Sequence, residues 1–228
     1  MPIDRFFFAG PLTPDLVITG DEFHHLKVVR IEVGEQIEIV NGKGSIATGT
    51  LTSLDKRSAH LTLANIQTTI RKPAHLILGI PFMRPNKLEW IIEKGTELGA
   101  DAFHLYPAQY SEKLQLYPNQ IERLHNLTVS ALKQSGRLFL PSFEILTSFN
   151  ELFATEGTIL FGDVDPKAPS LLTIKPGKTA LFITGPEKGF STEEETLLSQ
   201  KAKGVSLNPN TLRAETAPIA AISILSML

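Results

Sequence analysis

The chain has 228 residues, of which 42% are hydrophobic and 20% are charged, and it contains no cysteine. This composition is typical of a globular protein with one or two domains, and it excludes a disulfide framework, a thiolate metal site and a cysteine nucleophile. The formal net charge is −2, which argues mildly against nucleic-acid binding, although residues 71–137 carry an excess of basic side chains that could form a local patch.

The N-terminal segment lacks the long apolar core of a signal peptide, and the chain has no run of about 18 apolar residues. The absence of cysteine also fits a reducing compartment. We therefore expect a cytoplasmic protein that does not span a membrane.

The first third of the chain is predicted to form a small β-barrel or sandwich of short strands. Polar and apolar side chains alternate in 35–40 and in 59–66, which is the pattern of half-buried strands. The sequence Asn41-Gly-Lys-Gly44 lies between two strand-like runs and predicts a hairpin turn. The helix expected in this part covers 21–29, with Asp21 as its N-cap.

Beyond a domain boundary predicted at 69–73, strands alternate with helices. Short apolar runs typical of buried parallel strands are found at 76–80, 102–106, 158–161, 179–184 and 205–207. Helices are predicted over 86–98, capped by Asn86, and over 118–135. The alternation implies right-handed crossovers and a mainly parallel α/β sheet.

Two loops in the C-terminal part of the chain are candidates for a ligand pocket. The first, Gly185-Pro-Glu-Lys-Gly189, directly follows the strand predicted at 179–184, and the second is the irregular segment 207–217. Ligands of open α/β sheets bind at the carboxyl ends of strands, so neighbouring loops would form a pocket made largely of main chain. The first loop lacks the glycine patterns of phosphate and dinucleotide loops, and on spacing alone it reads as an ordinary strand-to-helix turn.

Charged side chains near these loops allow both structural and functional interpretations. Arg213 and Glu215 flank the start of the last helix, where they could carry chemistry or simply form an ion pair. Asp163-Val-Asp165 could bind magnesium, but beside Pro166 it is more typical of a turn.

Six motifs follow one another along the whole chain. They are His25 with Val28–Arg30, Ile92–Gly99, Ser111–Lys113, Lys133–Arg137 with Pro141, Gly185–Ser191 and Leu207–Ala217. Together they resemble the signature of the RsmE family, ribosomal small-subunit RNA (uracil-N3)-methyltransferases of the SPOUT superfamily. The chain departs from the family pattern where glycine, arginine or threonine is typical, at Lys113, Lys188, Asn208, Asn210 and Ala214.

This resemblance implies an α/β protein with a SPOUT-type, trefoil-knotted, mainly parallel sheet over residues 74–228, preceded by a small PUA-like β-barrel domain over residues 1–70. It further implies a homodimer, S-adenosylmethionine as the cofactor, 16S ribosomal RNA of the small subunit as the partner, and no metal. The expected reaction is methylation of N3 of a specific uridine.

The resemblance also assigns roles to individual residues. The cofactor is expected to bind at Leu160, Phe161, Gly162, Thr184, Gly185, Pro186, Glu187, Gly189, Leu207, Asn208 and Leu212. RNA is expected to contact Arg5, His25, Arg30, Lys113, Lys133 and Arg137, although scattered basic residues can equally belong to a solvated face. Arg213 is expected to stabilise the anionic base or hold a phosphate, and Glu215 to accept a proton or orient Arg213.

Three alternatives remain open at this point. The chain could be a SPOUT methyltransferase that acts on another RNA. It could also be a non-catalytic RNA-binding relative, which the departures at Lys188, Asn208, Asn210 and Ala214 would favour. A metal-dependent phosphate enzyme using Asp163 and Asp165 is the third alternative.

Overall fold

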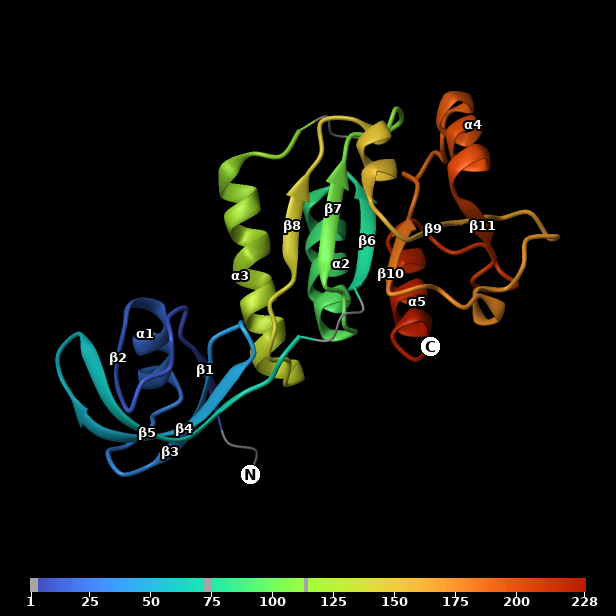
Figure 1. The fold of residues 1–228 in the computed structure, drawn as a ribbon. Coiled ribbons are helices and arrows are strands. Elements are labelled where there is room, and N and C mark those ends of the chain that lie inside the picture. The colour runs from blue at the N-terminus through green and yellow to red at the C-terminus, as the bar shows by residue number, and fades with distance from the viewer. Residues whose placement is uncertain (1–3, 72–74, 113–114) are drawn as a thin grey trace. The chain divides into compact units, whose positions relative to one another are not determined.

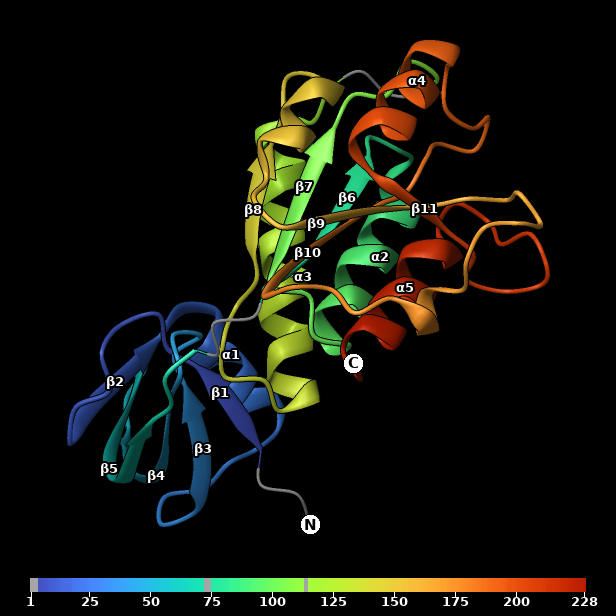
Figure 2. The same ribbon diagram turned by 45° about the vertical axis from the view of Figure 1, so that its right-hand side comes forward.

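The computed structural model divides into two compact units (Figures 1 and 2). Unit 1 comprises Met1–Arg71 with Leu132–Leu140, and unit 2 comprises Lys72–Ala131 with Pro141–Leu228. The residues that the structure describes are 4–71, 75–112 and 115–228. Among them, no helix has the length and apolar character needed to cross a membrane.

Unit 1 is a curled five-stranded sheet in the order β1-β3-β4-β5-β2, with one short helix packed on it (Figure 1). Its elements are β1 (Arg5–Phe7), β2 (Asp15–Thr19), α1 (Gly20–Val28), β3 (Gln36–Val40), β4 (Ser45–Leu54) and β5 (Ser58–Thr68). The predicted alternation is confirmed, because alternate side chains such as Ile37, Ile39 and Leu61 are buried and form the core of this unit.

The predicted hairpin turn is confirmed between β3 and β4. Asn41 Oδ1 accepts hydrogen bonds of 2.9 Å from the main-chain N–H groups of both Lys43 and Ser45. Gly44 has a φ of +99°, and a Cβ atom at this position would lie 2.4 Å from the carbonyl oxygen of Thr69. The turn therefore requires glycine there.

Unit 2 contains a six-stranded sheet in the order β11-β9-β10-β6-β7-β8, in which every neighbouring pair is parallel. The strands are β6 (His75–Pro81), β7 (Ala102–Tyr106), β8 (Ser142–Ile145), β9 (Thr158–Gly162), β10 (Thr179–Ile183) and β11 (Lys203–Val205). The predicted α/β class with a mainly parallel sheet is confirmed, while the trefoil knot stays a prediction.

Helices cover both faces of this sheet. On one face, α2 (Pro85–Glu97), α3 (Pro118–Ser135) and α5 (Thr216–Leu225) share a core with Phe182 of β10. On the other face, Leu181 and Ile183 pack with the 3-10 helix η1 (Phe149–Ala154) and with α4 (Thr192–Lys201). α2 and α5 lie side by side, as Figures 1 and 2 show, and α5 also contacts β6, β10 and the short 3-10 helix η2 (Leu171–Thr173).

Two predicted helix caps are wrong. The N-cap of α1 is Thr19, and Asp21 stands inside the first turn, where its negative charge favours the helix dipole. The N-cap of α2 is Arg84, because Pro85 occupies the first helical position, which suits its fixed φ. Asn86 therefore lies within the helix instead of before it.

The observed strands also differ from the prediction at three places. β11 ends at Val205, because from Ser206 onward the main chain bonds to the segment around Pro169 instead of β9, so Leu207 lies in a loop. The edge strands β2 and β8 were not predicted, and most of the side chains of each are exposed or only partly buried.

Candidate functional site

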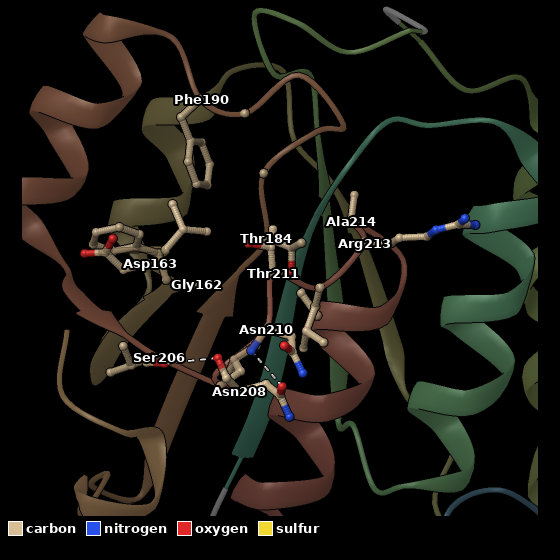
Figure 3. A pocket seen from close by; sticks show the side chains of 18 of the residues that line it. Gly162, Asp163, Thr184, Phe190, Ser206, Asn208, Asn210, Thr211, Arg213 and Ala214 are labelled. Carbon is tan, nitrogen blue, oxygen red and sulfur yellow. Dashed lines mark hydrogen bonds between the residues drawn. The ribbon is translucent and has the colours of Figure 1, made fainter. Parts of the chain in front are cut away.

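A cavity of about 1000 Å³ opens at the carboxyl ends of three neighbouring strands of unit 2 (Figure 3). Its walls are the end of β9 with the loop that follows (161–166), the loop 184–190 after β10, and the end of β11 with the loop that follows (205–215). These strands are adjacent and parallel, so their carboxyl ends meet at one edge of the sheet. The size suits a small-molecule ligand, and the position is where open α/β sheets bind one.

The first loop is anchored to the sheet through Thr184. Its main-chain N–H donates to the carbonyl oxygen of Gly79 at 2.9 Å, and its own carbonyl oxygen accepts a hydrogen bond of 2.6 Å from the hydroxyl of Tyr106. Tyr106 is fully buried, and this burial, with the nearby charge of Glu194, raises the pKa of its hydroxyl well above the ordinary value. The hydroxyl therefore stays protonated and remains a donor.

Two glycines give this loop its shape. Gly189 has a φ of +80°, and its N–H donates to the carbonyl oxygen of Pro186 at 2.9 Å. The ring of Phe190 packs so closely on Gly185 that a Cβ atom there would lie 3.1 Å from it. The main chain of this loop can therefore turn sharply and approach a ligand closely.

The helix after the first loop starts with a capping box. Ser191 and Glu194 bond reciprocally, with Ser191 N–H donating to Glu194 Oε2 at 2.8 Å and Glu194 N–H donating to Ser191 Oγ at 3.2 Å. Glu194 Oε1 also accepts a hydrogen bond of 2.8 Å from the main-chain N–H of Gln109. Glu194 is thus buried and satisfied, and of the three glutamates at this helix start Glu195 is the one that lines the cavity.

The second loop is held by its own asparagine. Asn208 Oδ1 accepts a hydrogen bond of 2.9 Å from Asn210 N–H, and Ser206 Oγ donates to the carbonyl oxygen of Asn208 at 3.5 Å (Figure 3). Such side-chain bonds to the backbone two residues on are the usual device of irregular turns. Asn208 and Asn210 therefore stabilise the local main chain in this protein.

The segment Asp163-Val-Asp165 forms the turn that its sequence favours. Asp163 Oδ1 accepts from Asp165 N–H at 2.9 Å, and Asp165 Oδ1 accepts from Lys167 N–H at 2.8 Å. Both carboxylates also line the cavity, which the sequence did not reveal. Within residues 4–71, 75–112 and 115–228, no group of three or more His, Cys, Asp or Glu side chains is arranged to hold a metal ion.

A cluster of charged side chains connects α2 with both loops. Lys87 Nζ lies 2.9 Å from Glu187 Oε1 and 3.3 Å from Glu215 Oε2. Arg213 Nη1 is 3.9 Å from Glu215 Oε1, and the Arg213 side chain is 85% exposed and extends away from Thr184 in Figure 3. The predicted pairing of Arg213 with Glu215 is therefore present but loose, and Lys87 is the closer partner.

The ion pair between Lys87 and Glu187 shifts the pKa values of both groups, upward for the lysine and downward for the glutamate. The hydrogen bond to Glu187 raises the pKa of Lys87, although burial opposes this. Burial alone would raise the pKa of Glu187, but the hydrogen bonds from Lys87 and the main chain, with the charges of Lys87 and Arg84, outweigh it and lower that pKa. Both groups are therefore charged at neutral pH.

Two buried polar atoms of the cavity lack a hydrogen-bond partner among the residues that the structure describes. One is Oε2 of Glu215, which has only the ion pair of 3.3 Å with Lys87. The other is Oγ1 of Thr184, whose residue is 5% exposed and lines the cavity. Because an unsatisfied buried hydroxyl is unfavourable, this atom is a candidate contact for a polar group of a ligand.

The structure brings most of the predicted cofactor residues together. The residues that line the cavity are Phe161, Gly162, Thr184, Gly185, Pro186, Glu187, Gly189, Leu207, Asn208 and Leu212, with Arg213 and Glu215. Leu160 instead lies fully buried in the core below. Lys188 is exposed and does not line the cavity, so its charge faces solvent. Sequence reasoning missed Lys87, whose place in the site depends on the packing of α2.

The side chains expected to contact RNA belong mostly to unit 1. Arg5 Nε and Nη2 both donate to Glu38 Oε2, at 2.9 and 2.6 Å, and Lys133 Nζ donates to Glu22 Oε1 at 2.5 Å. Of the remaining residues, His25 and Arg30 are exposed, Arg137 is partly buried, and Lys113 lies outside the described residues. The ring of His25 stands 5.2 Å from that of Phe6, so it packs on that ring although it is exposed.

Two family comparisons match the two parts of the chain. Residues 71–226 match the RNA methyltransferase domain, and residues 18–64 match the RNA methyltransferase PUA domain. The second match agrees with the PUA-like fold expected of the N-terminal sheet.

Individual relatives agree over nearly the whole length. The ribosomal RNA small subunit methyltransferase E of Bacillus subtilis is 32% identical over 93% of this chain and 90% of its own. That of Aquifex aeolicus is 29% identical over 92% of this chain and 93% of its own. The crystal structure of a ribosomal RNA small subunit methyltransferase E from Neisseria gonorrhoeae bound to S-adenosyl methionine superposes with a TM-score of 0.90 at 26% identity, covering 99% of this chain and 97% of that one.

Proposed function

Because the chain belongs to the ribosomal RNA small subunit methyltransferase E family, we propose that it methylates N3 of a specific uridine in 16S ribosomal RNA, with S-adenosylmethionine as the methyl donor. The observation that carries this proposal is the cavity built from three main-chain loops at the carboxyl ends of β9, β10 and β11. S-adenosylmethionine, when bound, supplies an activated methyl group.

The residues of the cavity fit this cofactor. Main-chain groups of 184–189 and 207–212 offer donors and acceptors at the cavity wall, and the orphaned Thr184 Oγ1 offers one more. The carboxylates of Asp163 and Glu195 add negative charge to the lining, which suits a ligand that carries positive charge. Recognition through the main chain also explains why side chains such as Asn208 can vary without loss of the pocket.

The protein's own contribution to the reaction is alignment and charge. Holding the uracil N3 beside the methyl group can supply roughly 7–11 kcal/mol of the barrier reduction. The transfer would break the bond between the methyl carbon and the sulfonium sulfur and form the bond to N3, and the weakly acidic N3 proton would leave to the Glu215 carboxylate or to water. The site must therefore stabilise the anionic base. In this proposal the exposed guanidinium of Arg213 contacts the anionic uracil or a neighbouring phosphate. Glu215, which lies between Lys87 and Arg213, orients the Arg213 side chain.

The N-terminal domain, placed at residues 1–70, is proposed to grip structured RNA through shape and phosphate contacts. Exposed side chains such as Arg30 and His25 are available for this, whereas Arg5 and Lys133 would have to exchange their ion pairs for phosphates. The same proposal includes a cytoplasmic homodimer and a trefoil-knotted methyltransferase domain at residues 74–228, and it uses no metal.

Methylation of small ribosomal subunits from a strain that lacks the corresponding enzyme tests this function. Digestion to nucleosides and mass spectrometry should then find N3-methyluridine only when protein and S-adenosylmethionine are both present. Lys201→Ala, a change on α4 outside the cavity, is the matched control and should leave the yield unchanged. A different methylated nucleoside, or no product, would contradict the proposed substrate.

A further inference from the structure

Lys87 contacts two loops of the cavity at the same time. Its ammonium lies 2.9 Å from Glu187 of the loop after β10 and 3.3 Å from Glu215 at the end of the loop after β11. Lys87 itself belongs to α2, which is far in sequence from both loops. One side chain therefore links three separate segments around the cavity.

The position of Lys87 is unfavourable for the helix that carries it. It is the third residue of α2, and cations in the first turn of a helix are opposed by the helix dipole. The first turn of α2 contains no acidic residue that would offset this. Local helix stability therefore gives no reason for a lysine here, whereas the two carboxylates do.

The cavity is lined by many acidic residues, so the positive charge of the Lys87 ammonium offsets repulsion between them. Its lining includes the carboxylates of Asp163, Asp165, Glu187, Glu195 and Glu215. Without Lys87, Glu187 would keep only the charge of Arg84, and Glu215 only the largely exposed Arg213 at 3.9 Å. Their repulsion would push the two loops apart, and both loops line the pocket.

Resting on the proposed function, we infer that Lys87 is a positioning residue that clamps Glu187 and Glu215 and so holds the two loops in the shape that binds the cofactor. It does not touch the reacting atoms. Removal of the Lys87 side chain would mainly weaken cofactor binding. It would affect the rate of methyl transfer only indirectly, through Glu215 and Arg213.

The test measures S-adenosylmethionine binding by calorimetry for the full chain and its variants. Lys87→Met is expected to weaken binding roughly 10- to 100-fold, because the hydrogen bond to Glu187 and the ion pair with Glu215 are both lost. Lys87→Arg keeps the charge and should bind several-fold more tightly than Lys87→Met. The matched control is Lys94→Met on the same helix, since Lys94 also bonds two carboxylates, Glu93 and Glu97 at 2.8 Å, but lies outside the cavity.

A double-mutant cycle separates a clamp from general destabilisation. If Lys87 acts on Glu187, the double variant of Lys87→Met and Glu187→Gln should bind no more weakly than Lys87→Met alone. Additive losses, or equal affinity of Lys87→Met and the wild type, would overturn the clamp. Should Lys87→Met fail to fold, Lys87→Arg and Glu187→Gln form the comparison, and unchanged affinity in both would overturn it. A wild type that binds no S-adenosylmethionine would instead overturn the proposed function, and the clamp with it.

Discussion

The hydroxyl of the buried Tyr106 donates a hydrogen bond of 2.6 Å to the main-chain oxygen of Thr184, the residue with which the loop after β10 begins. Tyr106 closes β7, which is separated from β10 by β6 in the sheet. The bond therefore connects the start of the candidate cofactor loop to a strand two places away in the sheet.

Replacing Tyr106 by phenylalanine should loosen this loop. The substitution leaves a buried carbonyl oxygen without its donor, which is expected to lower the free energy of unfolding by about 1–3 kcal/mol. Chemical denaturation measures this loss, and cofactor titration should show weaker binding. Tyr110→Phe is the control, because Tyr110 is 46% exposed and should tolerate the change. Equal losses in both variants would show that the bond to Thr184 has no special role.

Alanine at Gly189 should strain the same loop. Its φ of +80° is unfavourable for any residue with a Cβ atom, by roughly 1–2 kcal/mol, although no atom lies within 4 Å of that Cβ. We expect a loss of stability of this size and weaker cofactor binding, because the backbone must shift. Gly177→Ala, at a glycine with an ordinary φ and an open surrounding, should change neither quantity. Wild-type affinity in Gly189→Ala would argue against main-chain recognition by this loop.

Lys188 should matter little for cofactor binding, although glycine is the usual residue of the resembling family at this position. Its side chain is exposed and does not line the cavity. Lys188→Gly should leave the dissociation constant unchanged within about twofold, and should lower stability by no more than about 1 kcal/mol through the added freedom of the unfolded chain. A large gain in affinity would mean that the lysine reaches the ligand.

Stability should fall at acidic pH partly through His104. Burial lowers the pKa of His104, although the charge of Glu144, 3.0 Å away, opposes this. A histidine with a lowered pKa in the folded state takes up its proton more readily when unfolded. Its contribution to stability is thus present above the unfolded value of about 6.5 and is lost as the pH falls below it.

The measurement is the free energy of unfolding between pH 8 and pH 5 for wild type and His104→Gln. The variant should be less sensitive to pH in this window, while His24→Gln, at an exposed histidine, should retain the wild-type dependence. Identical curves for wild type and His104→Gln would show that His104 titrates normally.

Sequence patterns predicted the strands around the site well, because buried parallel strands carry continuous apolar runs. Thr179–Ile183 is one such run, and its following loop was marked by the glycines at 185 and 189. Lys87 gave no comparable signal, since an ion pair across a hundred residues depends on how α2 packs. The sequence likewise did not predict that Asp163 lines the cavity, because a turn motif does not show which way its side chains point.

Local capping was harder to predict than the sheet. Asn86 is a good cap by residue type, but Pro85 fixes the helix start one residue earlier. β8 was also hard to predict, because this exposed edge strand is stabilised by its pairing with β7 more than by burial of its own side chains.

A structure of the protein with S-adenosylmethionine tests the central claim most directly. The account predicts that the cofactor occupies the cavity and contacts the main chain of both 184–189 and 207–212, with Thr184 Oγ1 bonded to one of its polar groups. A cofactor bound elsewhere, or one that touches neither loop, would contradict it.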